Sequence, residues 1–274
     1  MNDYEPSSGM KDYLDSLYNR YNKQCFVQPD PLQFLYRYDN IREREIVGLI
    51  ASSLAYGRVA QIVKSVTAVL DRMVPSPFSF LERASRNVIV DTFSGFRHRF
   101  TDGRELSELL KGIKCVVAKH GSLYQCFRNL FCNNDESLLP ALSSFVDELK
   151  GSSNRGCNSL LPSPSKGSAC KRLNLFLRWM VREDDVDPGG WTGLSPAGLI
   201  VPLDTHMHRI GRELGFTERR QADMKTALEI TSSFRQMVPE DPVRYDFALT
   251  RLGIRSDINR EEHFALSLAK GATQ

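Results

Sequence analysis

The sequence predicts an all-α protein, and three observations support this fold class. Apolar side chains recur at helical spacing through most of the 274 residues, as in residues 46–54, where the aliphatic side chains share one broad face. Residues 87–91 (NVIVD) are the one strand-like stretch, and a single short run does not make a sheet. Hydrophobic residues at 41% and charged residues at 25% are typical of a globular protein, which excludes a wholly disordered chain.

The helices are delimited by caps, glycines and prolines. A charged start at residues 42–45 opens a helix that Gly57 stops, and Pro75 and Pro77 close the next one. Asp102 is an N-cap and Gly121 a stop for another helix. The predicted helices cover residues 11–23, 42–57, 58–73, 102–120, 123–132, 136–150, 171–182, 205–214 and 218–238, with a last one from Asp241-Pro242 to Gly253.

Residues 151–169 (GSSNRGCNSLLPSPSKGSA) are the clearest break in composition and are expected to form a loop or linker. The helix after it, residues 171–182 (KRLNLFLRWMVR), is apolar nearly all round and is therefore expected to be buried. Its polar stripe consists of Lys171, Asn174, Arg178 and Arg182. Two interpretations stay open for the stripe, the wall of a cleft or a solvated edge.

Composition also bears on location and cofactors. The longest apolar run near the C-terminal half, residues 194–203, is too short to span a bilayer, and residues 1–6 lack the features of a signal peptide, so we expect a cytoplasmic protein without membrane contact. No two of the six cysteines are spaced as C-x-x-C, so we expect neither a metal site nor another cofactor. A net charge of +3 weakly favours a polyanionic partner.

Two residues have positions suited to catalysis. Lys171 begins the buried helix, where the helix dipole and apolar neighbours disfavour a charged amine, and a neutral amine is a nucleophile that forms Schiff bases. Asp204 is the N-cap of the next helix, where a carboxylate stays ionised and stabilises nearby positive charge. Taken singly, a surface lysine at a frayed helix start and a purely capping aspartate are equally ordinary interpretations.

A family resemblance links these two positions. The stretch GSACK (residues 167–171) resembles the glycine hairpin that ends in the catalytic lysine of helix-hairpin-helix (HhH-GPD) DNA glycosylases. The stretch VPLDTHMHRI (residues 201–210), continued by RELG (residues 212–215), resembles the segment around their catalytic aspartate. Asp204 follows Lys171 by 33 positions, a spacing similar to the archaeal 8-oxoguanine glycosylase branch. The whole chain also resembles an uncharacterised bacterial family that is placed beside these enzymes.

The resemblance implies further residues that contact substrate or DNA: Tyr56, Arg58, Gly167, Arg178, Trp191 and His206. Tyr56 or Arg58 would fill the gap left in the base stack, because the family's glutamine-rich turn is missing, and Trp191 would stack on an extruded base. A core tyrosine and a surface arginine are the alternatives. Ala169 replaces the second hairpin glycine, which weakens the expected phosphate contact through backbone N–H groups.

A basic cluster adds a possible phosphate contact. Its members are Arg97, His98, Arg99 and Arg104. A solvated face is the alternative interpretation of the same residues.

The resemblance implies a two-lobed helical fold with a central cleft, one lobe spanning residues 41–195 and the other combining residues 1–40 with 196–274. It implies a base-excision glycosylase and abasic-site lyase that acts on a damaged base, such as an oxidised purine, in flipped-out form, with DNA as the partner and no obligate protein partner. Two alternatives remain. One is a catalytically inactive, glycosylase-like protein that binds nucleic acid, and the other is a helical enzyme acting on an anionic metabolite.

Overall fold

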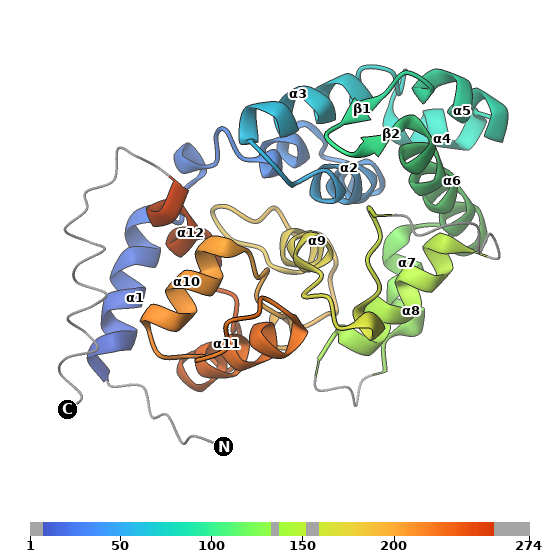
Figure 1. Ribbon diagram of the computed structural model, residues 1–274. Helices are drawn as coiled ribbons and strands as arrows, with labels where there is room; N and C mark the ends of the chain where they lie inside the picture. Colours follow the sequence, from blue (N-terminus) through green and yellow to red (C-terminus); the bar gives the residue numbers. More distant parts are fainter. Residues whose placement is uncertain (1–7, 133–136, 152–158, 255–274) are drawn as a thin grey trace.

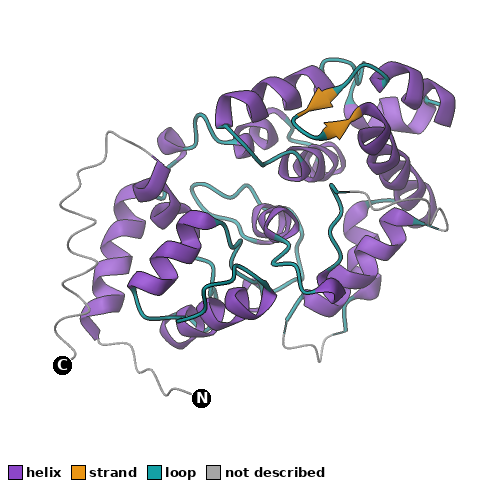
Figure 2. Ribbon diagram, viewed as in Figure 1, coloured by secondary structure: helices purple, strands orange, loops and turns teal. Residues whose placement is uncertain are grey.

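The computed structural model describes residues 8–132, 137–151 and 159–254, and most of them are helical (Figures 1 and 2). The α-helices are α1 (Ser8–Tyr21), α2 (Ile41–Ser53), α3 (Val59–Leu70), α4 (Pro77–Arg83), α5 (Arg86–Phe93), α6 (Gly103–His120), α7 (Leu123–Leu130), α8 (Leu139–Lys150), α9 (Lys171–Val181), α10 (Thr205–Glu213), α11 (Met224–Met237) and α12 (Asp246–Ile254). Short 3₁₀ helices cover Gln24–Phe26, Pro31–Arg37, Pro164–Lys166 and Pro196–Gly198. The all-α class is thereby confirmed.

Helix ends that carry a strong capping signal lie where the sequence predicts them. The Asp102 carboxylate accepts hydrogen bonds from the backbone N–H groups of Arg104 and Glu105 at the start of α6. Gly121 ends that helix with a φ of +86°, in the left-handed region that favours glycine. Helices α9 and α10 begin at Lys171 and Thr205, as expected.

The strand-like stretch at residues 87–91 is helical. These residues lie in α5, where the Ser85 hydroxyl accepts a hydrogen bond from the N–H of Val88 and where Ile89 and Phe93 are buried. Helix α5 packs against α6, and a Cβ at Gly103 would lie 1.9 Å from the carbonyl oxygen of Phe93, so only glycine permits this approach. Periodicity alone does not separate a short buried helix from a strand.

The strands of the described residues instead lie in the basic cluster. Strands β1 (Arg97–His98) and β2 (Thr101–Asp102) pair antiparallel, with a two-residue turn at Arg99 and Phe100. Figure 2 shows this hairpin at the edge of the molecule, and Figure 1 places it near α3, α5 and α6. The starts of α11 and α12 also differ from expectation: α11 begins at Met224, capped by Asp223, and α12 begins at Asp246 after a pair of turns.

Helix α9 lies near the centre of the molecule and is buried along most of its length, as predicted (Figure 1). Helix α2 packs along it. On its other side lie α1, α10, α11 and α12, of which α12 contacts both α1 and α10. Thus α1 and α12, near the two ends of the described chain, lie together. The lobe boundaries expected at residues 41 and 195 stay a prediction.

A membrane-spanning helix, which would need to be long and apolar, is not found among the described residues.

Candidate functional site

Lys171 and Asp204 face one another at the starts of two helices. The Lys171 Nζ lies 3.7 Å from the Asp204 Oδ2, and the two side chains are 32% and 18% exposed. Lys171 is the first residue of α9, and Asp204 is the N-cap of α10. The pair that the sequence analysis singled out is therefore in contact and open to solvent, within reach of a ligand.

The two carboxylate oxygens of Asp204 have different partners. Oδ1 accepts a hydrogen bond of 2.8 Å from the backbone N–H of Met207, which caps α10, whereas Oδ2 faces the Lys171 amine. The helix therefore fixes the rotamer of Asp204, and one oxygen remains directed at the amine. A fixed carboxylate in this place can orient the amine and stabilise positive charge beside it.

The loop before Lys171 is held on both sides. Gly167 has a φ of +77° and its carbonyl oxygen accepts a hydrogen bond from the N–H of Met224, at the start of α11. The Ala169 carbonyl accepts one from the buried side chain of Asn174. Cys170 is the second residue of this loop with a left-handed backbone, at a φ of +47°. Ala169, which replaces the second glycine of the glycosylase hairpin, does not have a left-handed backbone.

The structure corrects the expected place of Arg178. Its side chain is buried and not on the wall of an open cleft, and it forms ion pairs with Asp187 and with Asp246 of α12. Arg182, one turn later, pairs with Asp187, Asp184 and Asp241. At the C-terminal end of α9 the polar stripe is therefore buried in ion pairs. Both interpretations of the stripe, the wall of a cleft and a solvated edge, are wrong for this end of the helix.

These ion pairs also explain how Lys171 and Asp204 meet. Arg178 ties α9 to α12, and α12 in turn packs against α10, the helix that Asp204 caps. Asp246, which was not predicted as a site residue, joins α9 to α12 through its ion pair with Arg178. The pKa of Asp246 is raised to about 6, mainly by burial; the Arg178 charge lowers this pKa and the Asp204 charge raises it, so the three groups interact electrostatically.

The structure also corrects the expected place of Trp191. Its side chain is 1% exposed and packs against Phe127, Phe176 and Tyr124 in the core. Its Nε1–H donates to the Glu45 carboxylate over 3.1 Å. The glycine-rich loop around it suggested an accessible ring, but the aromatic neighbours bury it, and a stacking role for Trp191 is not carried further.

Tyr56 and Arg58 lie on the turn between α2 and α3. Tyr56 is half-buried, its hydroxyl donates to the His98 carbonyl oxygen over 2.9 Å, and it lies 2.7 Å from the Thr101 hydroxyl. Arg58 is exposed and occupies the N-cap position of α3. His206, in the first turn of α10, is half-buried and lies two residues from Asp204.

Arg172 connects this turn to the lysine. It follows Lys171 directly, its guanidinium lies 5.0 Å from the centroid of the Tyr56 ring, and it donates to the carbonyl oxygens of Ser53 and Ser159. The Tyr56 ring in turn stacks on Phe100, with centroids 4.8 Å apart. Phe100 was not predicted as a site residue, although the basic residues around it were.

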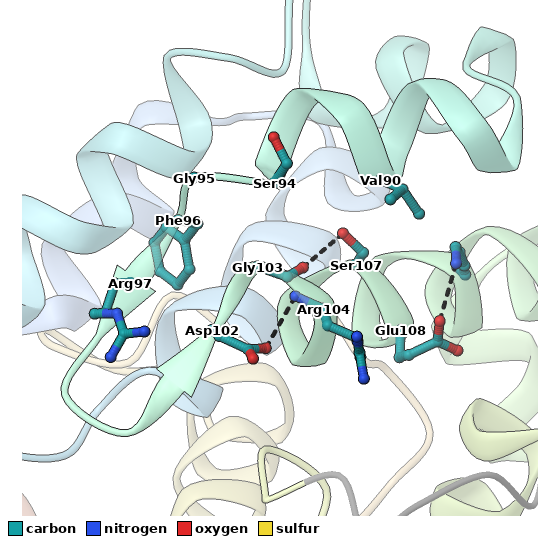
Figure 3. Close-up of a pocket in the computed structure, with 11 residues that line it drawn as sticks. Val90, Ser94, Gly95, Phe96, Arg97, Asp102, Gly103, Arg104, Ser107 and Glu108 are labelled. Carbon is teal, nitrogen blue, oxygen red and sulfur yellow. Dashed lines mark hydrogen bonds and ion pairs between the residues drawn. The ribbon is translucent and has the colours of Figure 1, made fainter.

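Two hollows of the surface lie away from the pair of Lys171 and Asp204. A cavity of about 690 Å³ between α5, the hairpin and α6 is shown in Figure 3, and a second one of about 1490 Å³ runs along α6 and α8. The first is lined by opposite charges, including Arg97, Asp102 and Glu108. Neither of the two contains Lys171 or Asp204, so the candidate site is a surface pair and not one of these cavities.

Comparison with protein families finds one match over most of the chain. Residues 30–255 match a family described as a protein of unknown function (DUF2400). The chain belongs to this family. No curated protein and no solved structure matches it. The DUF2400 match covers both Lys171 and Asp204, so the candidate site lies within the part of the chain that defines the family.

Proposed function

We propose that this DUF2400 protein is a base-excision DNA glycosylase with abasic-site lyase activity, and that its helices form the two-lobed arrangement of helix-hairpin-helix glycosylases. The observation that carries the proposal is the contact between Lys171 Nζ and Asp204 Oδ2 at 3.7 Å, at a partly exposed junction of two helix starts. The motif resemblance around both residues agrees with it. The exposed arginines at positions 58, 97 and 99 would contact phosphates.

The chemistry assigns one role to each residue. The Lys171 nitrogen attacks C1′ of the sugar of an extruded nucleotide with its lone pair, the bond from C1′ to the base breaks, and the base leaves with the bonding electrons. The attacking nitrogen gives up one proton, which neutralises the departing base, the sugar ring opens, and a Schiff base between Nζ and C1′ results. Asp204 stabilises the positive charge that develops on the sugar and then on the imine. Loss of a proton from C2′ and departure of the 3′ phosphate with the electrons of the C3′–O bond then cut the strand.

Borohydride trapping tests the proposal directly. Borohydride reduces a Schiff base to a stable amine, so the protein becomes covalently attached to DNA that contains 8-oxoguanine, uracil or an abasic site. We expect an adduct with the unaltered protein and none with Lys171→Gln. Lys166→Gln is the matched control, because Lys166 is exposed and lies in the same loop five residues earlier. Absence of any adduct, or an adduct that persists in Lys171→Gln, contradicts the assignment.

Asp204→Asn separates chemistry from folding. Asparagine caps a helix as well as aspartate does, so the start of α10 should survive the substitution. The charge beside the amine is lost, and we expect adduct formation to slow on the order of 100-fold. Single-turnover trapping rates at equal protein stability measure this change.

A second candidate is a protein that binds damaged DNA without catalysis. The ion pair itself favours it, because a lysine held as a cation against a carboxylate is not a nucleophile. This candidate requires salt-dependent DNA binding that survives the loss of both Lys171 and Asp204. Turnover that disappears with either substitution excludes it.

A further inference from the structure

The turn of the β1–β2 hairpin presents an aromatic side chain to solvent. Phe100 is 66% exposed, whereas the neighbouring strand residues His98 and Thr101 are fully buried. Arg99, the other turn residue, has a φ of +53°, a conformation that L side chains rarely adopt. The hairpin therefore holds an apolar ring in water at the end of a fixed support, where burial in the core would be the ordinary outcome for phenylalanine.

The ring is not loose, because Tyr56 supports it. The two rings are stacked, with an interplanar angle of 24°. Tyr56 is itself fixed by its hydroxyl group and by an edge contact with the His98 ring, whose Nδ1 lies 2.9 Å from the Ser65 hydroxyl. Phe100 thus has a rigid base, which lowers the entropy lost when a flat ligand stacks on it.

Positive charge surrounds this aromatic pair. The side chains of Arg58, Arg97 and Arg99 are exposed. The Arg99 side chain lies close over the backbone of Gly57, because a Cβ added at Gly57 would lie 2.7 Å from the Arg99 Cδ.

Arg172 lies against the Tyr56 ring, and its guanidinium donates hydrogen bonds to the backbone carbonyl groups of Ser53 and Ser159. Two acids lie in this region and have backbone partners: the Asp102 carboxylate accepts hydrogen bonds from N–H groups of α6. Glu105, whose charge acts on Tyr56 and Arg172, accepts one from the N–H of Ser159.

We propose that Phe100, backed by Tyr56, stacks on a nucleobase of DNA next to the nucleotide that reaches Lys171. The inference rests on the proposed function and adds a residue that determines which DNA is bound. A ring face matches a base, and the surrounding arginines match the phosphates on either side of it. Direct contacts lead from the start of α9 to Phe100: Arg172, which follows Lys171 in the chain, lies against the Tyr56 ring, and that ring stacks on Phe100.

The test uses the full chain and a duplex that carries an abasic-site analogue with 2-aminopurine as the neighbouring base. Affinity is measured by fluorescence anisotropy, and stacking by the emission of 2-aminopurine. We expect Phe100→Ala to weaken binding about 10-fold and to abolish the change in emission, and Phe100→Trp to retain both. Val74→Ala is the control, because Val74 is 68% exposed and lies outside the hairpin.

The outcomes separate this inference from the proposed function. Equal affinity and equal emission change for Phe100→Ala and the unaltered protein overturn the inference, even where the Lys171 adduct forms. Failure of the unaltered protein to bind any DNA overturns it as well. Binding that depends on Phe100 without a borohydride adduct supports the inference while the proposed catalysis fails.

Discussion

At the scale of single residues, the candidate site depends on helix ends. Asp204 caps α10 with one carboxylate oxygen and faces Lys171 with the other. The same carboxylate therefore makes a local capping bond and a contact with a residue distant in the sequence. The capping role follows from an aspartate before a helix and was predictable. The contact with Lys171 was suggested by the family resemblance, since the spacing of 33 positions does not by itself bring two residues together.

Arg178 provides a test of a structural role against a binding role. Arg178→Ala would leave Asp187 and Asp246 buried without this partner, and we expect the free energy of unfolding to fall by about 3–5 kcal/mol. Urea denaturation measures the loss. Arg209→Ala is the control, because Arg209 is half exposed in its weak pair with Glu213 and should change stability by less than about 1 kcal/mol. A stable Arg178→Ala protein with weakened DNA binding would restore the original expectation.

Burial of individual polar and aromatic residues was the part that the sequence did not reveal. Trp191 is bonded to Glu45, 146 positions earlier, and Arg178 to Asp246, 68 positions later. A tryptophan in a glycine-rich loop and an arginine on a helix stripe look accessible when only their neighbours in the chain are considered. Their partners lie on distant segments, and helical periodicity carries no information on such pairs.

At the scale of elements, the loop before α9 sets the position of the lysine. Gly167 adopts a left-handed conformation, and the loop is fixed to α11 by the Gly167 carbonyl and by a bridge between Ser168 and Asp223. The element ends were predictable where caps and glycines mark them, as at α6, α9 and α10. They were not predictable at α5, where the β-branched residues of a short helix imitate a strand.

Substitution of Gly167 tests whether this loop contributes to DNA binding. At a φ of +77° alanine is strained, and we expect Gly167→Ala to cost about 1 kcal/mol of stability and to slow the formation of the Lys171 adduct. Gly121→Ala is a close control, because Gly121 has a φ of +86° and, like Gly167, no atom within 4 Å of the added Cβ. Thermal unfolding and trapping rates should show equal destabilisation but a slower adduct for Gly167→Ala alone. An equal adduct rate in both variants would contradict a role of the loop.

At the scale of the whole molecule, one buried carboxylate joins three segments. Glu45 of α2 accepts hydrogen bonds from the N–H groups of Leu123 and Tyr124 at the start of α7 and from the Trp191 ring. Burial raises the pKa of Glu45 to about 7, although these donors lower it. The all-α class was predictable from periodicity, whereas this junction between α2, α7 and the loop at residue 191 was not, because it needs the folded chain.

The raised pKa of Glu45 makes stability depend on pH. The unfolded chain releases this proton near pH 4.5 and the folded chain near pH 7, so the unfolded state binds fewer protons in between. The free energy of unfolding therefore loses up to about 1.4 kcal/mol per pH unit as the pH rises through this window. Glu45→Gln cannot titrate and should lack this loss, although it is less stable overall because its amide accepts hydrogen bonds through one oxygen only.

Urea denaturation between about pH 5 and about pH 7 measures the difference. The gap in stability between the unaltered protein and Glu45→Gln should narrow as the pH rises. Glu218→Gln, at an exposed position, should follow the unaltered protein throughout. A gap that stays constant over the window would contradict the role assigned to the carboxyl group.

The contact between α1 and α12 has a consequence for the order in which the chain can fold during synthesis. The Tyr245 hydroxyl donates to Asp15, 230 positions earlier, and Arg251 pairs with Asp30, 221 positions earlier. Helices α2 to α9 can pack as soon as they leave the ribosome, but α1 can complete its packing only after α12 has been made. The side of the molecule that carries Asp204 is therefore completed last, and the amine of Lys171 meets its carboxylate only after nearly the whole described chain has been made.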